Sequence, residues 1–81
     1  MKLPRDLSGS ELAKKLNLYG YRTTRQTGSH IRLTTTQNGE HHITLPNHSS
    51  LRVGTLAAIL ADIASHFEVT KEELITKLFE N

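Results

Sequence analysis

The chain has 81 residues, a formal net charge of +2 and no cysteine. A chain of this length buries only about 60% of the surface of its unfolded form, so we expect one core and a single domain over residues 1–81. The lack of cysteine excludes disulfides, thiol nucleophiles and thiolate metal ligands.

The sequence also bears on location. Pro4, Arg5 and Asp6 interrupt the beginning of the chain, which therefore lacks the apolar stretch of a secretory signal. The apolar run over 56–64 is well short of the roughly 20 residues that span a bilayer. We therefore expect no membrane contact and a cytoplasmic location.

Positive charge is concentrated in the first part of the chain. Residues 1–36 hold seven Lys or Arg against two acidic residues, a net charge of +5, whereas residues 37–81 carry a net charge of −3. A basic region suits a polyanion such as RNA, because cations near the phosphates release their counterions. An ordinary solvated surface has the same composition, so the charge alone does not separate these two interpretations.

The first predicted element is a helix over residues 9–18. Ser8 and Glu11 form the pattern of a capping box, in which each side chain satisfies a backbone N–H at the helix start. Gly20 stands where a left-handed residue would end the helix. An apolar stripe at helical spacing faces the core, and it consists of Leu12, Ala13, Leu16 and Tyr19.

Residues 21–46 predict three antiparallel strands joined by tight turns at 27–29 and 37–39. Apolar residues alternate with polar ones in the second and third strands, so each strand turns one face toward the core. A single core requires the two apolar pairs to lie on the same side of the sheet. These pairs are Ile31 with Leu33, and Ile43 with Leu45.

The second turn decides whether that requirement is met. A two-residue turn would pair Leu33 with Thr44 and place the apolar pairs on opposite faces, whereas a three-residue loop over 37–39 pairs Leu33 with Ile43. We therefore predict the three-residue loop, with Gly39 supplying a positive φ.

This register directs a group of polar side chains to the face of the sheet opposite the helices, the open face. The first strand is ambiguous, because residues 21, 23 and 25 or residues 22, 24 and 26 could form its inner set. We favour the set that turns Tyr21 inward. The polar residues expected on the open face are His30, Arg32, Thr34, His42 and Thr44.

Two further helices follow. The apolar residues between 56 and 67 recur at helical spacing, and Thr70 with Glu73 repeats the capping-box pattern before a helix over 70–79. The order helix, three strands, helix, helix predicts an α+β fold, with a three-stranded antiparallel sheet and the helices on one face. The predicted core residues of these helices are Leu56, Ile59, Leu60, Ile63, Phe67, Leu74, Ile75, Leu78 and Phe79.

Four short motifs stand in order along the chain and cover about residues 8–79. The motifs are Gly20-Tyr21, Arg25-Gln26-Thr27-Gly28-Ser29-His30, Ile43-Thr44-Leu45-Pro46-Asn47-His48, and Gly54-Thr55-Leu56 with Ile59-Leu60. The α-β-β-β-α order resembles the double-stranded-RNA-binding domain (dsRBD-like) fold with an additional C-terminal helix, and the motifs make the chain similar to the HicA-like mRNA interferase toxins.

The resemblance implies a toxin of a type II toxin-antitoxin system that cleaves mRNA. It also implies a HicB-like antitoxin as a protein partner that covers the active face. The family's functional histidine lies in the Gly-Ser-His motif, which corresponds to His30. The chain differs from many members in its longer C-terminal helix over 70–79 and at residues 63–66, which bears on packing and antitoxin pairing.

The residues themselves suggest how RNA would be cleaved. The reaction needs a base for the 2′-hydroxyl proton, a cation for the phosphorane and an acid for the leaving 5′-oxygen, and histidine changes role near neutral pH. We therefore expect His30 to be catalytic, beside a turn where Gly28 and Ser29 let a phosphate approach the backbone. Arg25 and Arg32 are candidates for binding that phosphate. The scheme uses neither a metal nor a cofactor.

Other roles stay open. His48 is either a second acid-base group or a cap for the turn before the next helix, and we favour the structural role. Ser29 is either a phosphate contact or only a turn former, and both arginines could simply be solvated. A metal site is not expected, because His41 and His42 point to opposite faces and no Asp or Glu accompanies them.

A competing interpretation belongs to a different functional class. In a non-catalytic double-stranded-RNA-binding module of the same fold, the helix face around Lys14 and Lys15 would grip duplex RNA by its shape. A plain protein-interaction domain is a third interpretation. Replacing His30 separates the first two, since it abolishes cleavage by an enzyme and changes little in a binding module.

Overall fold

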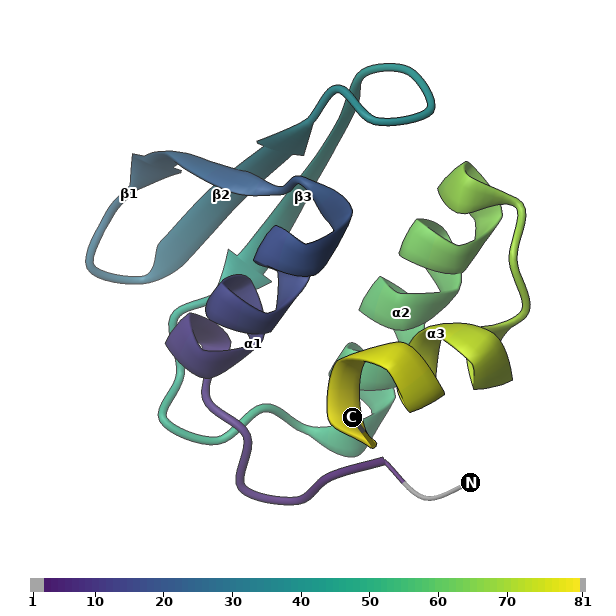
Figure 1. Ribbon diagram of the computed structural model, residues 1–81. Coiled ribbons are helices and arrows are strands. Elements are labelled where there is room, and N and C mark those ends of the chain that lie inside the picture. Colours follow the sequence, from purple (N-terminus) through teal and green to yellow (C-terminus); the bar gives the residue numbers. More distant parts are fainter. Residues whose placement is uncertain (1–2, 81) are drawn as a thin grey trace.

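The computed structural model describes residues 3–80. A short helix and a 3-10 turn precede the strands, and two longer helices follow them (Figure 1). In chain order the elements are α1 (Gly9–Lys15), the 3-10 helix η1 (Leu16–Tyr19), β1 (Arg22–Gln26), β2 (His30–Thr35), β3 (His41–Pro46), α2 (Val53–Phe67) and α3 (Lys71–Phe79).

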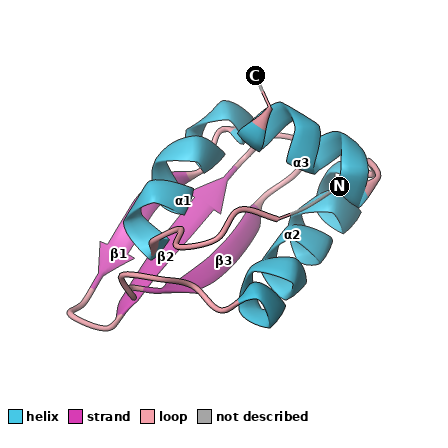
Figure 2. Ribbon diagram, turned by 90° about the horizontal axis from the view of Figure 1, so that it is seen from below, coloured by secondary structure: helices cyan, strands magenta, loops and turns pink. Residues whose placement is uncertain are grey.

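The strands form an antiparallel sheet in the order β1-β2-β3, and the helices gather on one side of it (Figure 2). α1 packs on β2 and β3, α2 packs on β3, and α3 packs on α2. The helix-facing side of the sheet is buried, which confirms the predicted α+β architecture. Its apolar residues are Ile31, Leu33, Ile43 and Leu45.

The first helix starts as predicted and ends in a tighter form. Ser8 Oγ accepts the Glu11 backbone N–H at 3.0 Å, and the Ser8 N–H donates to Glu11 Oε1 at 2.9 Å. The α-helical hydrogen bonding stops at Lys15 and continues as the 3-10 helix η1. Gly20 ends this segment with a φ of 81°, in the left-handed region that glycine adopts without strain.

The β2–β3 hairpin has the predicted register. Leu33 pairs with Ile43 and Ile31 with Leu45, so the apolar pairs face the helices together. Gly39 has a φ of 96°, and its neighbour Asn38 also lies in the left-handed region, with a φ of 56°. The turn chemistry and the core therefore agree on one register.

Strand β1 follows neither of the two predicted alternations, because it contains a bulge. Arg22 pairs with Thr34 and Thr23 with Leu33, but after the register shift Arg25 pairs with Arg32. The bulge therefore reverses the alternation partway along the strand. Tyr21, just before β1, is fully buried as expected, whereas the residues of β1 itself are all exposed.

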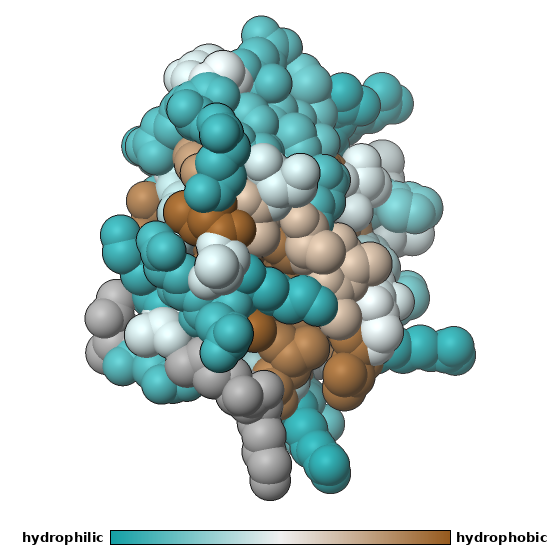
Figure 3. Space-filling model, turned by 90° about the vertical axis from the view of Figure 1, so that its right-hand side faces the viewer, coloured by the Kyte–Doolittle hydropathy of each residue, from teal (hydrophilic) through white to brown (hydrophobic). Residues whose placement is uncertain are grey.

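Helices α2 and α3 supply the rest of the core, although Ile59, Phe67 and Phe79 are only partly buried. Thr70 caps α3 by accepting the Glu73 N–H at 3.0 Å. Figure 3 shows apolar surface on one side of the molecule. Val53, the first residue of α2, is 54% exposed. Within residues 3–80 no single helix is long and apolar enough to cross a membrane; α2 and α3 taken together would pass by length and composition, but they are bent by 108°.

Candidate active site

The open face of the sheet carries the polar side chains that the helices leave uncovered. Directly paired residues of neighbouring strands point to the same face, so the pairings of Thr34 and Arg32 extend this set across all three strands. Thr24 belongs to it as well, because its hydroxyl lies 3.2 Å from that of Thr34. The open face therefore comprises Arg22, Thr24 and Arg25 from β1, His30, Arg32 and Thr34 from β2, and His42 and Thr44 from β3.

His30 is the first residue of β2, and its side chain is exposed. Its ring Nδ1 lies 3.0 Å from Ser29 Oγ, which fixes one side of the imidazole. The backbone is held as well, because the His30 N–H donates to Thr27 Oγ1 at 3.0 Å and its carbonyl accepts the Thr27 N–H at 2.9 Å. No atom of residues 3–80 hydrogen-bonds Nε2, so this nitrogen is available to a substrate.

The turn before His30 is tied to the end of β3. The Asn47 N–H donates to the Ser29 carbonyl at 2.9 Å, and the Asn47 amide donates to the Gly28 carbonyl at 3.4 Å. A Cβ placed on Gly28 would meet no atom within 4 Å, so the space above this turn is open. Ser29 contacts the His30 ring through its hydroxyl, and a phosphate contact of Ser29 stays a prediction.

Three guanidinium groups accompany the imidazole. Arg25 and Arg32 are direct partners across β1 and β2, as a shared phosphate site requires. The bulge adds Arg22, which the sequence analysis did not select, because a regular strand would turn Arg22 and Arg25 to opposite faces. Within the described part of the chain none of the three forms an ion pair. Planar guanidinium groups without carboxylate partners are suited to binding phosphate.

His42, a residue of β3, lies on the open face, near the end of β2 that is farther from His30. Its Nδ1 is 2.8 Å from Thr34 Oγ1, and its Nε2 is 2.7 Å from Glu40 Oε2. Both ring nitrogens are thus engaged within the protein, unlike those of His30. The expectation that no acidic residue accompanies these histidines was wrong. Glu40 stands only two residues before His42, so the local sequence already contained the signal for this contact.

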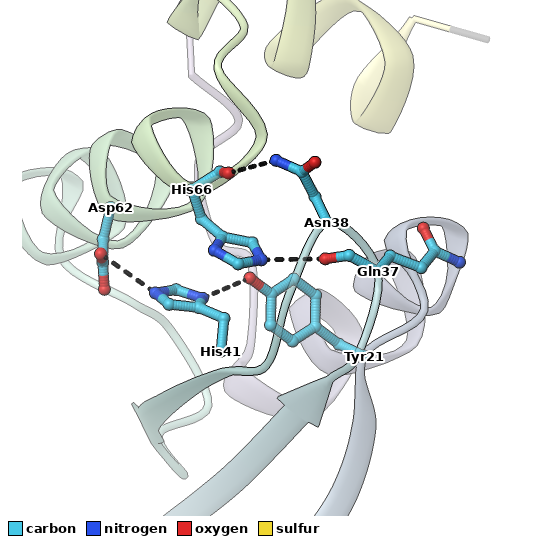
Figure 4. A network of polar contacts seen from close by, with 6 residues as sticks. All are labelled: Tyr21, Gln37, Asn38, His41, Asp62 and His66. Carbon is cyan, nitrogen blue, oxygen red and sulfur yellow. Dashed lines mark hydrogen bonds and ion pairs between the residues drawn. The ribbon is translucent and has the colours of Figure 1, made fainter.

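His41 faces the helices, opposite to His42 as predicted, and also has a carboxylate partner. Its Nε2 lies 3.3 Å from Asp62 Oδ1 in α2, a contact between residues far apart in the sequence (Figure 4). Its Nδ1 lies 2.6 Å from the Tyr21 hydroxyl. Burial, followed by the charge of Asp62, raises the pKa of Tyr21, so this hydroxyl keeps its proton.

The side chains around His41 form a cluster that also holds the loop between β2 and β3 against the end of α2 (Figure 4). The His66 ring stacks on His41 with centroids 4.4 Å apart, and its Nε2 donates to the Gln37 carbonyl at 2.9 Å. Asn38 donates to the His66 carbonyl at 2.9 Å. Over residues 3–80 no group of three or more His, Cys, Asp or Glu is arranged to hold a metal ion. The cluster joins the sheet to α2 on the side away from the open face.

His48 contributes to the structure through its backbone. Its carbonyl accepts the Gly9 N–H at 3.0 Å, which docks the start of α1 against the segment after β3. Its side chain is exposed and lines a hollow with Pro46 and Arg52. This contact is made by the backbone and at α1, so a capping role of His48 before α2 and an acid-base role of its ring both stay predictions.

The basic helix face of the competing RNA-binding interpretation is smaller than the sequence suggests. Lys15 turns toward α3, where its ammonium donates to the Leu78 carbonyl at 3.5 Å and lies 5.6 Å from the centre of the Phe79 ring. Lys14 is exposed and lines a cleft between α1 and β1. The two lysines therefore do not act as one patch.

One of the comparisons with known proteins agrees with the sequence motifs. Residues 9–64 match the family model described as "HicA toxin of bacterial toxin-antitoxin". Among the curated proteins and the solved structures, none matches the chain significantly.

The family match spans more than half of the chain, from α1 through most of α2. It includes every residue of the open face. The chain therefore belongs to the HicA toxin family of toxin-antitoxin systems. Helix α3 lies beyond the matched range, in line with the longer C-terminal helix noted in the sequence.

Proposed function

We propose that this chain is an mRNA-cleaving endoribonuclease toxin in which His30 is the catalytic acid-base residue and no metal takes part. The observation that carries the proposal is an exposed imidazole, with Nε2 unoccupied by described residues, on the same face as three arginines without ion pairs. The family match independently supports the coarser statement that the chain is a toxin.

In the proposed reaction, His30 Nε2 takes the proton of a ribose 2′-hydroxyl. The 2′-oxygen then bonds to the adjacent phosphorus, the bond from phosphorus to the 5′-oxygen breaks, and that oxygen takes a proton from water. His30 afterwards returns its proton to the solvent. The products are a 2′,3′-cyclic phosphate and a free 5′-hydroxyl. Ser29 Oγ supports this chemistry, because a proton on Nδ1 shared with Ser29 leaves the lone pair on Nε2.

Arg25 and Arg32 have the second role. A guanidinium donates two parallel N–H groups to a phosphate and neutralises charge that grows in the transition state. Direct pairing across β1 and β2 brings these two residues together on the face that carries His30. Gly28 would let the RNA backbone approach the turn, where a Cβ would still meet no protein atom.

The proposed partners follow from the same face. A toxin of this family implies an antitoxin, and we propose a HicB-like protein that covers the open face and so blocks His30 and the arginines. The proposed mRNA substrate places the toxin in the cytoplasm. Stress-related growth arrest would follow from loss of transcripts.

The test is cleavage of a single-stranded RNA by the purified chain, with and without a chelator, and analysis of the new ends. We expect cyclic phosphate and 5′-hydroxyl ends, unchanged by the chelator, and a rate about 10²- to 10⁴-fold lower for His30→Ala. His42→Ala is the matched control, since it removes an imidazole from the same face. Equal rates for wild type and His30→Ala would refute the assignment.

A further inference from the structure

A hollow lies beyond the end of β3, where the chain turns into α2. Its volume is about 270 Å³, several times the roughly 30 Å³ that a water molecule occupies in the liquid. The residues that line it are Pro46, His48, Leu51, Arg52 and Thr55. No acidic residue of the described range 3–80 is among them, so no carboxylate in the lining repels an anion.

The two side chains of this hollow that can bind an anion are free to do so. Arg52 and His48 are exposed, and within the described part of the chain neither side chain forms a hydrogen bond or an ion pair. Asp6 contacts the same loop through the Ser50 hydroxyl, at 3.5 Å, and is not paired with Arg52. A guanidinium without a carboxylate partner can donate two parallel N–H groups to one phosphate, and an imidazole can donate one.

The hollow adjoins the proposed catalytic residue through Pro46. This proline pairs directly with His30 across β2 and β3, so it lies beside His30 on the open face, and it also lines the hollow. Paired Cα atoms lie about 4.5–5.5 Å apart and two further residues add at most about 7 Å, so the Cα atoms of His30 and His48 are within about 12 Å of each other. Asn47 fixes this arrangement by donating to both carbonyls of the turn over 28–29.

His30 therefore lies between two groups of cations. Arg22, Arg25 and Arg32 lie toward the β1 edge of the sheet, and Arg52 follows the opposite edge strand β3. RNA carries a phosphate on every nucleotide, so a strand that crosses the open face at His30 presents phosphates on both sides of the bond that is cut. The hollow lies where the strand would leave the sheet past β3.

We propose that this hollow binds a phosphate of the RNA next to the one that is cut, through Arg52 and with His48 as a second donor. The inference rests on the proposed function, since it extends the contact with the RNA substrate beyond the cut bond. Contacts to phosphate oxygens position a nucleic acid without reading its bases. Arg52 should therefore promote the cutting of all RNA sequences alike.

The test uses short RNAs in which one nucleotide keeps its 2′-hydroxyl and the others carry 2′-O-methyl groups, so that only one bond can be cut. In each RNA a single flanking phosphate is replaced by an uncharged methylphosphonate. Wild type, Arg52→Ala and Lys71→Ala are compared on this set and on the fully charged RNA. Lys71→Ala is the matched control, because it removes an exposed cation from the start of α3. Thermal melting of each variant establishes that it is folded.

Neutralising one flanking phosphate should lower cutting by wild type and by Lys71→Ala about tenfold or more. Arg52→Ala should be slower by a similar factor on the fully charged RNA and lose nothing further when that phosphate is neutralised. His48→Ala should show the same pattern with a smaller loss. On unmodified RNA, the slope of log kcat/KM against log salt should be smaller by about 0.7–1 for Arg52→Ala than for Lys71→Ala.

The proposal is overturned if Arg52→Ala is as sensitive as wild type to every neutralised phosphate, or if Arg52→Ala and Lys71→Ala have equal salt slopes; both results leave the ribonuclease standing. Should the methylated RNAs resist cutting, the salt slopes on unmodified RNA decide. An Arg52→Ala variant that cuts normally but no longer binds the antitoxin would make the hollow a protein contact instead. Failure of wild type to cut unmodified RNA refutes the proposed function and this inference with it.

Discussion

At the scale of single residues, the open face gathers His30 and three arginines without a carboxylate beside them. Glu40 is the acidic residue that bonds to a side chain of the open face, but its partner is His42 and not an arginine. The absence of a carboxylate partner for the arginines matters, because a carboxylate next to Arg25 or Arg32 would compete with a phosphate for the guanidinium. The arginines should therefore contribute directly to substrate binding and charge stabilisation.

Replacing Arg32 by alanine should lower RNA cleavage by roughly ten- to a hundredfold, the loss expected for one charge-assisted contact to phosphate. Lys71→Ala is the control, since it removes the same charge from the start of α3, outside the open face. The cleavage rates of wild type and of both variants are measured at two salt concentrations and compared. An equal loss in both variants would mean that only the overall charge of the protein matters.

A second residue-scale prediction concerns Gly9, which is buried where α1 meets the end of β3. A Cβ here would collide with the Pro46 carbonyl oxygen, so Gly9→Ala should lower the free energy of unfolding by about 1–3 kcal/mol. Gly54→Ala is the opposite case, because a Cβ in that turn of α2 meets no atom within 4 Å. It should leave stability unchanged or raise it by up to about 1 kcal/mol. Urea unfolding of both variants measures the difference, and equal stabilities would contradict this packing.

At the scale of elements, the capping box makes the start of α1 sensitive to pH. Hydrogen bonds with the backbone and then the side chain of Ser8 lower the pKa of the Glu11 carboxyl. A carboxyl with a lowered pKa in the folded state stabilises the protein above its ordinary pKa of 4.5, and this contribution is lost as the pH falls through the folded value.

The stability of Glu11→Gln should therefore fall below that of wild type at neutral pH and approach it under acidic conditions. Glutamine keeps an acceptor at the capping position, so the variant removes the charge and little else. Urea unfolding at pH 7 and near pH 3 measures both differences. A stability gap that widens on acidification would contradict a lowered pKa of Glu11 in the folded protein.

The elements also show how far the sequence alone determines the site. Alternation in β2 and β3 predicted the open face, because one core cannot accept Ile31 with Leu33 and Ile43 with Leu45 on opposite sides. The bulge in β1 could not be predicted in this way, since every residue of that strand is exposed and no alternation of apolar residues constrains its register. Arg22 was missed for this reason. The contact between His41 and Asp62 joins distant segments and cannot be inferred from local spacing.

At the scale of the whole molecule, the buried Tyr21 hydroxyl bonds His41 of β3, and His41 in turn bonds Asp62 of α2. Tyr21→Phe removes this hydrogen bond and should lower the free energy of unfolding by about 0.5–1.5 kcal/mol. RNA cleavage should be unchanged, because His41 lies on the helix side of the sheet. A double-mutant cycle with His41→Ala measures the coupling, and a coupling energy near zero would show that the pair does not stabilise the fold.

The two layers of the molecule thus divide its tasks in our proposal: the helix side maintains the fold, and the open face presents the residues to which we assign RNA cleavage. The most direct measurement is the fraction of intact cellular transcripts after induced expression of wild type and of an equally abundant, folded His30→Ala variant. We predict that wild type depletes full-length transcripts and stops growth, whereas His30→Ala does neither. Intact transcripts with wild type, or equal depletion by both proteins, would contradict catalysis by this imidazole.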